Sequence, residues 1–155
     1  MAERRPPQHE VTLLRQWNDL RTGFRDLADE LLNDVEANAG LAPSSFQVLW
    51  FLVTAPEQSA PMSRLAETLG FTTAGTTKVA DRLADAGFVE RETHPADRRV
   101  ILAVLTDAGR EKAVAASTVL AKALEERVVG RIGADAFAAL VDTIGALTPG
   151  SSKDR

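Results

Sequence analysis

The sequence contains no cysteine and only two histidines among its 155 residues. Without cysteine, the chain forms neither a disulfide framework nor a thiolate metal site, and it cannot sense oxidation through a thiol. His9 and His94 are isolated, and neither is at metal-ligand spacing from another ligand. We therefore expect the protein to bind no metal and no cofactor.

Long hydrophobic runs are missing as well. No stretch approaches the roughly 18 consecutive apolar residues that cross a membrane, and the opening residues MAERRPPQHE lack the apolar segment of a signal peptide. We expect a cytoplasmic protein. The sequence also has no Gly-rich phosphate loop, no nucleophile motif and no distinctive pair of carboxylates. An enzyme is therefore the disfavoured interpretation.

Periodic apolar residues mark a long helix near each end of the chain. Near the N-terminus their spacing alternates between four and three residues, as in a heptad seam of Leu13, Trp17, Leu20, Phe24, Leu27 and Leu31. A second stripe comprises Phe137, Leu140, Val141, Ile144 and Leu147. These stripes predict an N-terminal dimerisation helix over residues 10–40 and C-terminal dimerisation helices over 106–147. Residues 1–9 and 148–155 have little to bury, and we expect a flexible arm and tail there.

Between these helices, residues 41–105 have the pattern of a winged helix-turn-helix. An apolar segment beginning at Pro43 predicts a buried helix, and two short amphipathic segments flank a turn at Gly70. The runs FVERET and RVILAVLT are extended and rich in β-branched residues, and HPADR between them has the Pro and Asp of a turn. The sequence therefore predicts a mainly α (α+β) fold. In such a fold the second short helix enters the DNA major groove, and the hairpin lies over the adjacent minor groove.

The composition of the second short helix supports this interpretation. The stretch from Thr68 to Ala80 holds four threonines after the turn, one lysine and no acidic residue. Short hydroxyl side chains donate to phosphates and touch thymine methyl groups. The DNA-binding residues predicted in and around this helix are Thr72, Thr73, Thr76, Thr77 and Lys78, with Arg82 placed on a phosphate.

The net charge of −4 argues weakly against a nucleic-acid partner. Between Arg64 and Val100, however, six basic side chains balance six acidic ones. The excess acidity therefore lies outside the segment predicted to bind DNA, and the cations of that segment are free to face phosphates.

Two arginines at the tip of the predicted hairpin are candidates for the minor groove. Arg98 and Arg99 follow Asp97 directly after the turn. An arginine at such a tip can enter the narrow, strongly negative minor groove of A/T-rich DNA, where it reads groove width more than base identity. Asp97 is predicted to hold the guanidinium of Arg99 in place.

With these motifs the chain resembles the MarR family of bacterial transcriptional regulators over most of its length. The family pattern DxRxxxxxLTxxG is present as Asp97, Arg99, Leu105, Thr106 and Gly109. Lys78 stands where many members carry arginine, so that a bidentate guanine contact is not expected there. The resemblance implies a homodimer with interlocking terminal helices and a pseudo-palindromic operator. It also implies a repressor that a small aromatic or phenolic ligand releases from DNA.

Two alternatives concern binding. The first concerns four aromatic residues, Trp17, Phe24, Phe46 and Trp50. They either line the ligand pocket or belong to the ordinary core of the dimer or the domain. In the second alternative, the winged-helix dimer is a protein-interaction module without specific DNA binding. That interpretation predicts that replacing Arg99 by alanine leaves partner binding intact.

Overall fold

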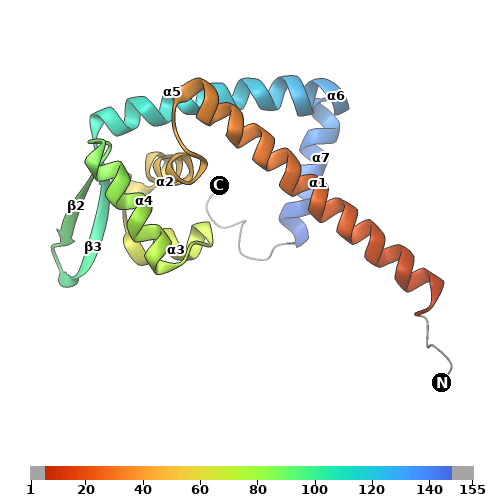
Figure 1. Cartoon of the computed structure of the whole chain (residues 1–155), viewed down its shortest axis with the longest axis horizontal. Coiled ribbons are helices and arrows are strands. Elements are labelled where there is room, and N and C mark those ends of the chain that lie inside the picture. Colours follow the sequence, from red (N-terminus) through yellow and green to blue (C-terminus); the bar gives the residue numbers. More distant parts are fainter. Residues whose placement is uncertain (1–5, 148–155) are drawn as a thin grey trace.

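The structure of the chain is a computed structural model that describes residues 6–147. Helices dominate it, and the one small sheet lies at one end of the molecule, next to α4 (Figure 1). The elements, in chain order, are α1 (Gln8–Ala39), α2 (Pro43–Thr54), the 3-10 turn η1 (Pro56–Gln58), β1 (Ser59–Pro61), α3 (Met62–Leu69), α4 (Thr73–Asp85), β2 (Val89–His94), β3 (Asp97–Leu105), α5 (Asp107–Leu124), the π-helical turn η2 (Glu125–Val129), α6 (Gly130–Ile132) and α7 (Ala134–Leu147).

The boundaries predicted for the long terminal helices are close to those observed. α1 begins at Gln8, two residues before the predicted start, and residues 8 and 9 are therefore helical rather than part of an arm. The helix ends where expected, because Gly40 adopts the left-handed conformation (φ 61°) and its N–H bonds to the carbonyl of Glu36. Residues 1–5 of the predicted arm and the predicted tail 148–155 lie outside the described residues.

Two helices of the fold begin with the same cap. The side-chain oxygen of Thr72 accepts a hydrogen bond from the N–H of Gly75 at the start of α4, at 3.0 Å. At the start of α5, Thr106 accepts from the N–H of Gly109, also at 3.0 Å. Each threonine satisfies one of the backbone donors that a helix leaves unpaired at its N-terminus.

The strands form an antiparallel sheet in the order β1-β3-β2. β2 and β3 make the predicted hairpin, whereas β1 was not expected from the sequence. Its three residues are too few to show an alternating pattern, although Ala60 is buried against Ala103 of β3. β1 fastens the hairpin to the segment that leads into α3.

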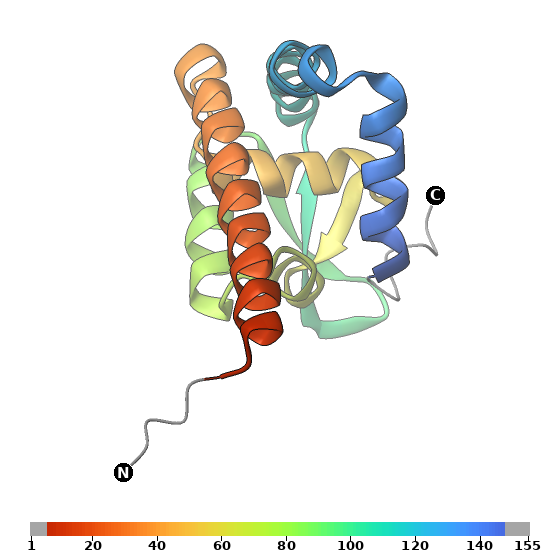
Figure 2. The same cartoon turned by 90° about the vertical axis from the view of Figure 1, so that its right-hand side faces the viewer.

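A single hydrophobic core holds the winged lobe, which comprises α2, α3, α4 and the three strands. α2 is central because its buried side chains, Phe46, Val48, Leu49 and Leu52, contact α3, α4, β3 and α5. α5 crosses this lobe and packs on the C-terminal half of α1, where Leu31 and Val35 are buried. The N-terminal half of α1 projects away from the lobe, and α7 descends from the far end of α5, apart from α1 in the second view (Figures 1 and 2).

The fold is therefore a winged helix-turn-helix with long helical extensions at both ends, as the sequence predicted. No helix among residues 6–147 combines the length and the apolar character needed to cross a membrane.

Candidate nucleic-acid interface

One face of α4 is free of contacts with the core and carries short polar side chains. Thr73, Thr77 and Lys78 are exposed there. The hydroxyl of Thr77 donates to the carbonyl of Thr73 at 3.0 Å, which leaves its oxygen able to accept a further bond. Thr72 is also exposed, but its oxygen serves as the helix cap. The helix therefore presents hydroxyl groups and one ammonium group to solvent.

Thr76 is an exception, and its predicted role in DNA binding is wrong for this structure. Its side chain is only 2% exposed, and its hydroxyl donates to the carbonyl of Thr72 at 3.0 Å. Thr76 lies three residues before Val79, so helical periodicity places both on the face that packs against the core. Its polar group is satisfied inside the helix, and the methyl group contributes to packing.

Arg82 reaches across to the start of α2. Its Nη2 donates to the hydroxyl of Ser44 at 3.2 Å, while the residue as a whole stays exposed. The side chain thus occupies the surface where α4 and the first turn of α2 meet. The contact of Arg82 with a phosphate stays a prediction.

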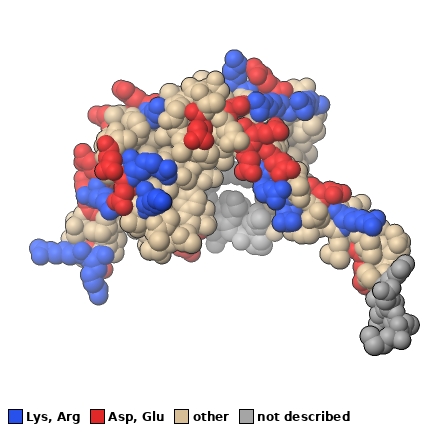
Figure 3. Space-filling view, in the orientation of Figure 1, with Lys and Arg blue, Asp and Glu red and all other residues tan. Residues whose placement is uncertain are grey.

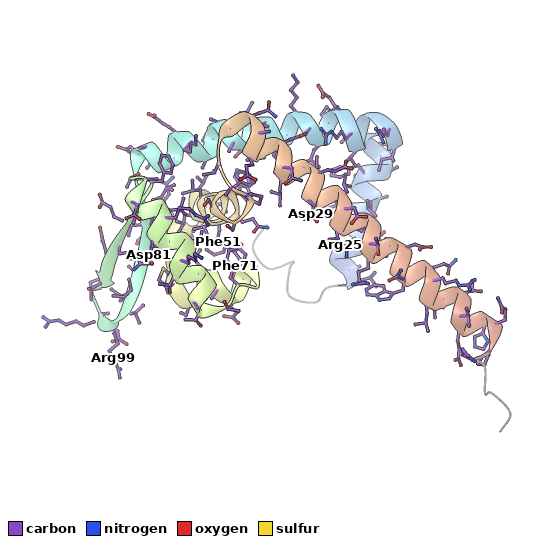
Figure 4. All side chains as sticks on the ribbon, in the orientation of Figure 1. Arg25, Asp29, Phe51, Phe71, Asp81 and Arg99 are labelled. Atoms are coloured by element: carbon purple, nitrogen blue, oxygen red, sulfur yellow. The ribbon has the colours of Figure 1, made fainter. Side chains whose placement is uncertain are left out.

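The hairpin tip carries the most exposed cation for which the structure gives an ion pair. Nε of Arg99 lies 3.4 Å from Oδ1 of Asp97, and the Arg99 side chain is 93% exposed. The same carboxylate oxygen accepts the backbone N–H of Arg99 at 3.0 Å, so Asp97 fixes the backbone of the turn more firmly than the guanidinium. Basic side chains project from the end of the hairpin, and Arg99 points away from the molecule (Figures 3 and 4). Arg98 is exposed beside it.

A surface hollow of about 320 Å³ joins α4 to the hairpin. Its lining includes Thr77 from α4, Arg99 from β3 and Arg91 from β2, together with Met62, Ser63, Val100 and Ile101. The structure thus brings two predicted site residues, Thr77 and Arg99, to one concave surface. Arg91 was missed by the sequence analysis, because a single arginine within a strand has no distinguishing pattern.

The four aromatic residues proposed to line a ligand pocket do not share one cavity. Phe46 is buried in the core and stacks on Trp50 of the same helix, with ring centroids 6.4 Å apart. Trp17 and Phe24 lie on the half of α1 that projects from the lobe, and both are exposed. A pocket lined by all four is therefore wrong for the single chain, because α1 diverges from α2.

Phe24 does line a different cavity, of about 460 Å³, between α1 and the C-terminal helices. The wall from α1 includes Leu20 and Leu27, and the opposite wall includes Ile132 and Leu140. Arg127 and Arg131 add positive charge to this mostly apolar cavity. Arg127 is already paired, because its Nη2 lies 2.6 Å from Oδ2 of Asp34.

Comparison with known proteins shows which family this architecture is similar to. Residues 39–100, which span the winged lobe as far as the start of β3, match the model of the MarR family. A curated relative, described as an uncharacterized HTH-type transcriptional regulator, YkoM of Bacillus subtilis (strain 168), is 32% identical over 88 residues. That alignment covers 57% of this chain and 55% of the relative, so the chain spans about half the length of the curated relative.

Solved structures share the fold over nearly the whole chain. Sco3205, a MarR family transcriptional regulator from Streptomyces coelicolor solved in complex with DNA, has a TM-score of 0.78 and 24% identity over 95% of this chain and 91% of its own. The transcriptional repressor CouR, bound to a 23-mer DNA duplex, has a TM-score of 0.74 and 26% identity over 92% of this chain and 98% of its own.

The fold and the matched motif define a winged helix-turn-helix protein with helical extensions. Over residues 39–100 the chain is similar to the MarR family, and its fold matches that of solved MarR family regulators. The curated relative and the two solved structures are described as transcriptional regulators or a repressor.

Proposed function

We propose that the chain is a homodimeric transcriptional regulator that binds a specific, pseudo-palindromic DNA operator and acts as a repressor. The observation that carries the proposal is the hollow shared by α4 and the hairpin, which places Thr77 and Arg99 on one concave surface. A winged helix that holds its second helix in the major groove needs its hairpin over the adjacent minor groove, on this same side.

In this binding mode the exposed residues of α4 and of the hairpin contact different parts of the DNA. Thr73, Thr77 and Lys78 meet base edges and phosphates in the major groove, and Arg82 meets a phosphate beside it. Arg99 enters the minor groove, where a narrow A/T-rich segment attracts a guanidinium. Phosphate contacts provide affinity and its dependence on salt, and base contacts provide specificity.

Dimerisation is supported by the apolar surface that the single chain leaves exposed. On the projecting half of α1 the exposed apolar residues are Leu13, Leu14, Trp17, Leu20 and Phe24. On α7 they are Val141, Ile144 and Leu147. Monomeric soluble proteins rarely expose contiguous apolar patches of this kind, and a two-fold partner would cover them. A two-fold dimer would set its recognition helices about 34–36 Å apart, one turn of DNA.

Release from DNA by a small aromatic or phenolic ligand is the further part of the proposal. The cavity between α1 and α7 has apolar walls, and the guanidinium of Arg131 at its edge suits a carboxylate or phenolate. A ligand there would contact both helices that we propose to dimerise. It would lower operator affinity only if it binds better to the chain conformation that fits DNA poorly. Benzoate and phenol are suitable first probes in a competition titration, and no change in operator affinity with either would contradict this part.

Fluorescence anisotropy tests the central proposal. The wild-type chain is first used to select duplexes from a random pool, and the enriched duplex is compared with a scrambled one at two salt concentrations. We expect preference for the enriched duplex and weaker binding at the higher salt concentration. Enrichment of no sequence, with weak and equal binding to both duplexes, would favour the alternative of a protein-interaction module without specific DNA binding.

A further inference from the structure

We propose that the hollow between α4 and the hairpin is a binding site for one phosphate of the DNA backbone, and that Arg91 of β2 is the residue that binds it. This inference rests on the proposed function, because it requires a duplex on this face. It adds a contact residue that neither the sequence motif nor the exposed tip of the hairpin indicates.

The hollow lies where the DNA backbone would cross the chain in the proposed binding mode. A sugar-phosphate strand is the boundary between a major groove and the adjacent minor groove. With α4 in one groove and the hairpin tip in the other, that strand crosses the surface between them. This surface is the hollow, whose polar lining consists of Ser63, Thr77, Arg91 and Arg99.

Arg91 is held in this hollow by two contacts to the same nitrogen. Its Nη2 lies 2.6 Å from Oδ1 of Asp81, and it also donates to the carbonyl of Thr77 at 3.2 Å. Among the described residues, Nε and Nη1 of Arg91 make no hydrogen bond. A guanidinium has five N–H donors in a fixed plane, so the tether at Nη2 leaves the remaining donors available to a second acceptor.

This arrangement distinguishes Arg91 from the arginine at the tip. The Arg91 side chain is 35% exposed, against 93% for Arg99. A side chain that is already ordered loses less conformational freedom when it binds than a free one does. Arg91 is therefore prepared for a phosphate at a fixed place, whereas Arg99 is free to follow the width of the minor groove.

A substitution at Asp81 distinguishes a phosphate-binding role of Arg91 from a purely structural one. It lies on α4 next to the hairpin (Figure 4), and its carboxylate both tethers Arg91 and places a negative charge near the proposed phosphate. If Arg91 binds phosphate, Asp81→Asn keeps an oxygen acceptor for the tether and removes the repulsion, so DNA binding should be equal or tighter. If Arg91 only braces the hairpin against α4 through the ion pair, Asp81→Asn should weaken binding as Arg91→Ala does.

The experiment measures anisotropy on the enriched duplex over a range of salt concentrations. Arg91→Ala is expected to weaken binding at least tenfold. The slope of log K against log salt is expected to fall by about 0.9 for each phosphate that the variant no longer neutralises, and by about twice that in a dimer. Arg25→Ala is the matched control, because Arg25 also pairs with an exposed carboxylate, that of Asp26, but lies on the projecting part of α1 (Figure 4). It should change neither quantity.

A second measurement locates the phosphate. Neutral methylphosphonate linkages replace the phosphates of the enriched duplex one at a time. One position in each half-site should weaken binding of the wild-type chain and leave that of Arg91→Ala unchanged.

The outcomes separate the inference from the function on which it rests. Equal losses of affinity in Arg91→Ala and Asp81→Asn at an unchanged salt slope would overturn the phosphate site and leave Arg91 as a brace. Unaltered binding by Arg91→Ala would overturn both roles while the proposed function stands. If the wild-type chain enriches no duplex, the proposed function fails first and the phosphate site with it. Far-ultraviolet circular dichroism of each variant establishes that it is folded.

Discussion

The hydroxyl group of Thr106 donates a hydrogen bond to the backbone carbonyl of Gly87, at 2.8 Å. The same oxygen accepts the N–H of Gly109 and so caps α5. One side chain therefore fastens the turn that follows α4 to the first turn of α5. The pattern DxRxxxxxLTxxG accordingly has two parts, because its first half shapes the hairpin tip and its second half joins the end of α4 to the start of α5.

Gly109 is required by the close approach of these two segments. A Cβ at this position would overlap the carbonyl oxygen of Phe88 and would lie 2.9 Å from Cδ1 of Leu105. We predict that Gly109→Ala destabilises the chain by about 3 kcal/mol, since neither the backbone oxygen nor the buried leucine has room to move. Urea unfolding followed by circular dichroism measures this change in stability.

The neighbouring residue provides the control for helix propensity. Ala108 is exposed in the same turn, and Ala108→Gly exchanges the same two residue types in the opposite direction. It should cost about 1 kcal/mol or less, which is the difference in helix propensity. If propensity and not the contact with Phe88 determined the effect at position 109, Gly109→Ala would stabilise the chain by about 1 kcal/mol, so a stabilised variant would contradict the close approach.

Most of the fold could be predicted from the sequence, because its elements have strong local patterns. The seam of α1, the glycine at its end and the extended runs of the hairpin each depend on residues close in sequence. Two features could not be predicted in this way. β1 is a strand only because it pairs with β3, and the ion pair of Arg91 with Asp81 joins a strand to a helix through tertiary packing.

The sequence shows which residue types lie in and around α4, but it does not show which way they face. The four threonines lie within about two turns of helix, and the sequence alone does not show which of them face the core. In the structure Val79, Ala80 and Leu83 are buried, and Thr76 is buried because it lies on the same face of α4. The aromatic residues show the same limit, since their spacing predicts a shared face along one helix but not the divergence of α1 from α2.

Thr76 and Thr77 form a matched pair for testing this assignment. Thr76→Val keeps the buried shape and removes a hydroxyl that only bonds within the helix, so DNA affinity should stay within about twofold while stability falls by about 1 kcal/mol. Thr77→Val removes an exposed hydroxyl from the interface and should weaken DNA binding by about fivefold to tenfold with little effect on stability. Anisotropy and thermal unfolding of both variants measure the two quantities. A larger loss of DNA affinity in Thr76→Val than in Thr77→Val would refute the assignment.

The two arginines at the hairpin tip should differ in what they recognise. Successive side chains of a strand point to opposite faces, and only Arg99 of the pair lines the hollow that faces DNA in our proposal. We predict that Arg99→Ala weakens binding about tenfold and abolishes the preference for A/T-rich flanks of the operator. Arg98→Ala should weaken binding less and retain that preference.

Anisotropy with two duplexes that differ only in A/T-rich or G/C-rich flanks measures this effect. The prediction fails if Arg99→Ala keeps the full difference between the two duplexes, or if Arg98→Ala is the variant that loses it.

The exposed stripe on α1 makes the oligomeric state testable with one substitution. Trp17 is 60% exposed in the single chain, so Trp17→Glu should leave the fold of the chain intact. In a dimer the glutamate would be buried without a partner, at a cost of about 3 kcal/mol or more, and self-association should weaken by at least about a hundredfold. Sedimentation velocity at micromolar concentration should then show a monomer.

Arg15→Glu is the control, because Arg15 is exposed about 200° around the helix from Trp17 and should leave the dimer unaffected. A wild-type chain that sediments as a monomer, or a Trp17→Glu variant that still sediments as a dimer, would show that this stripe is not the interface.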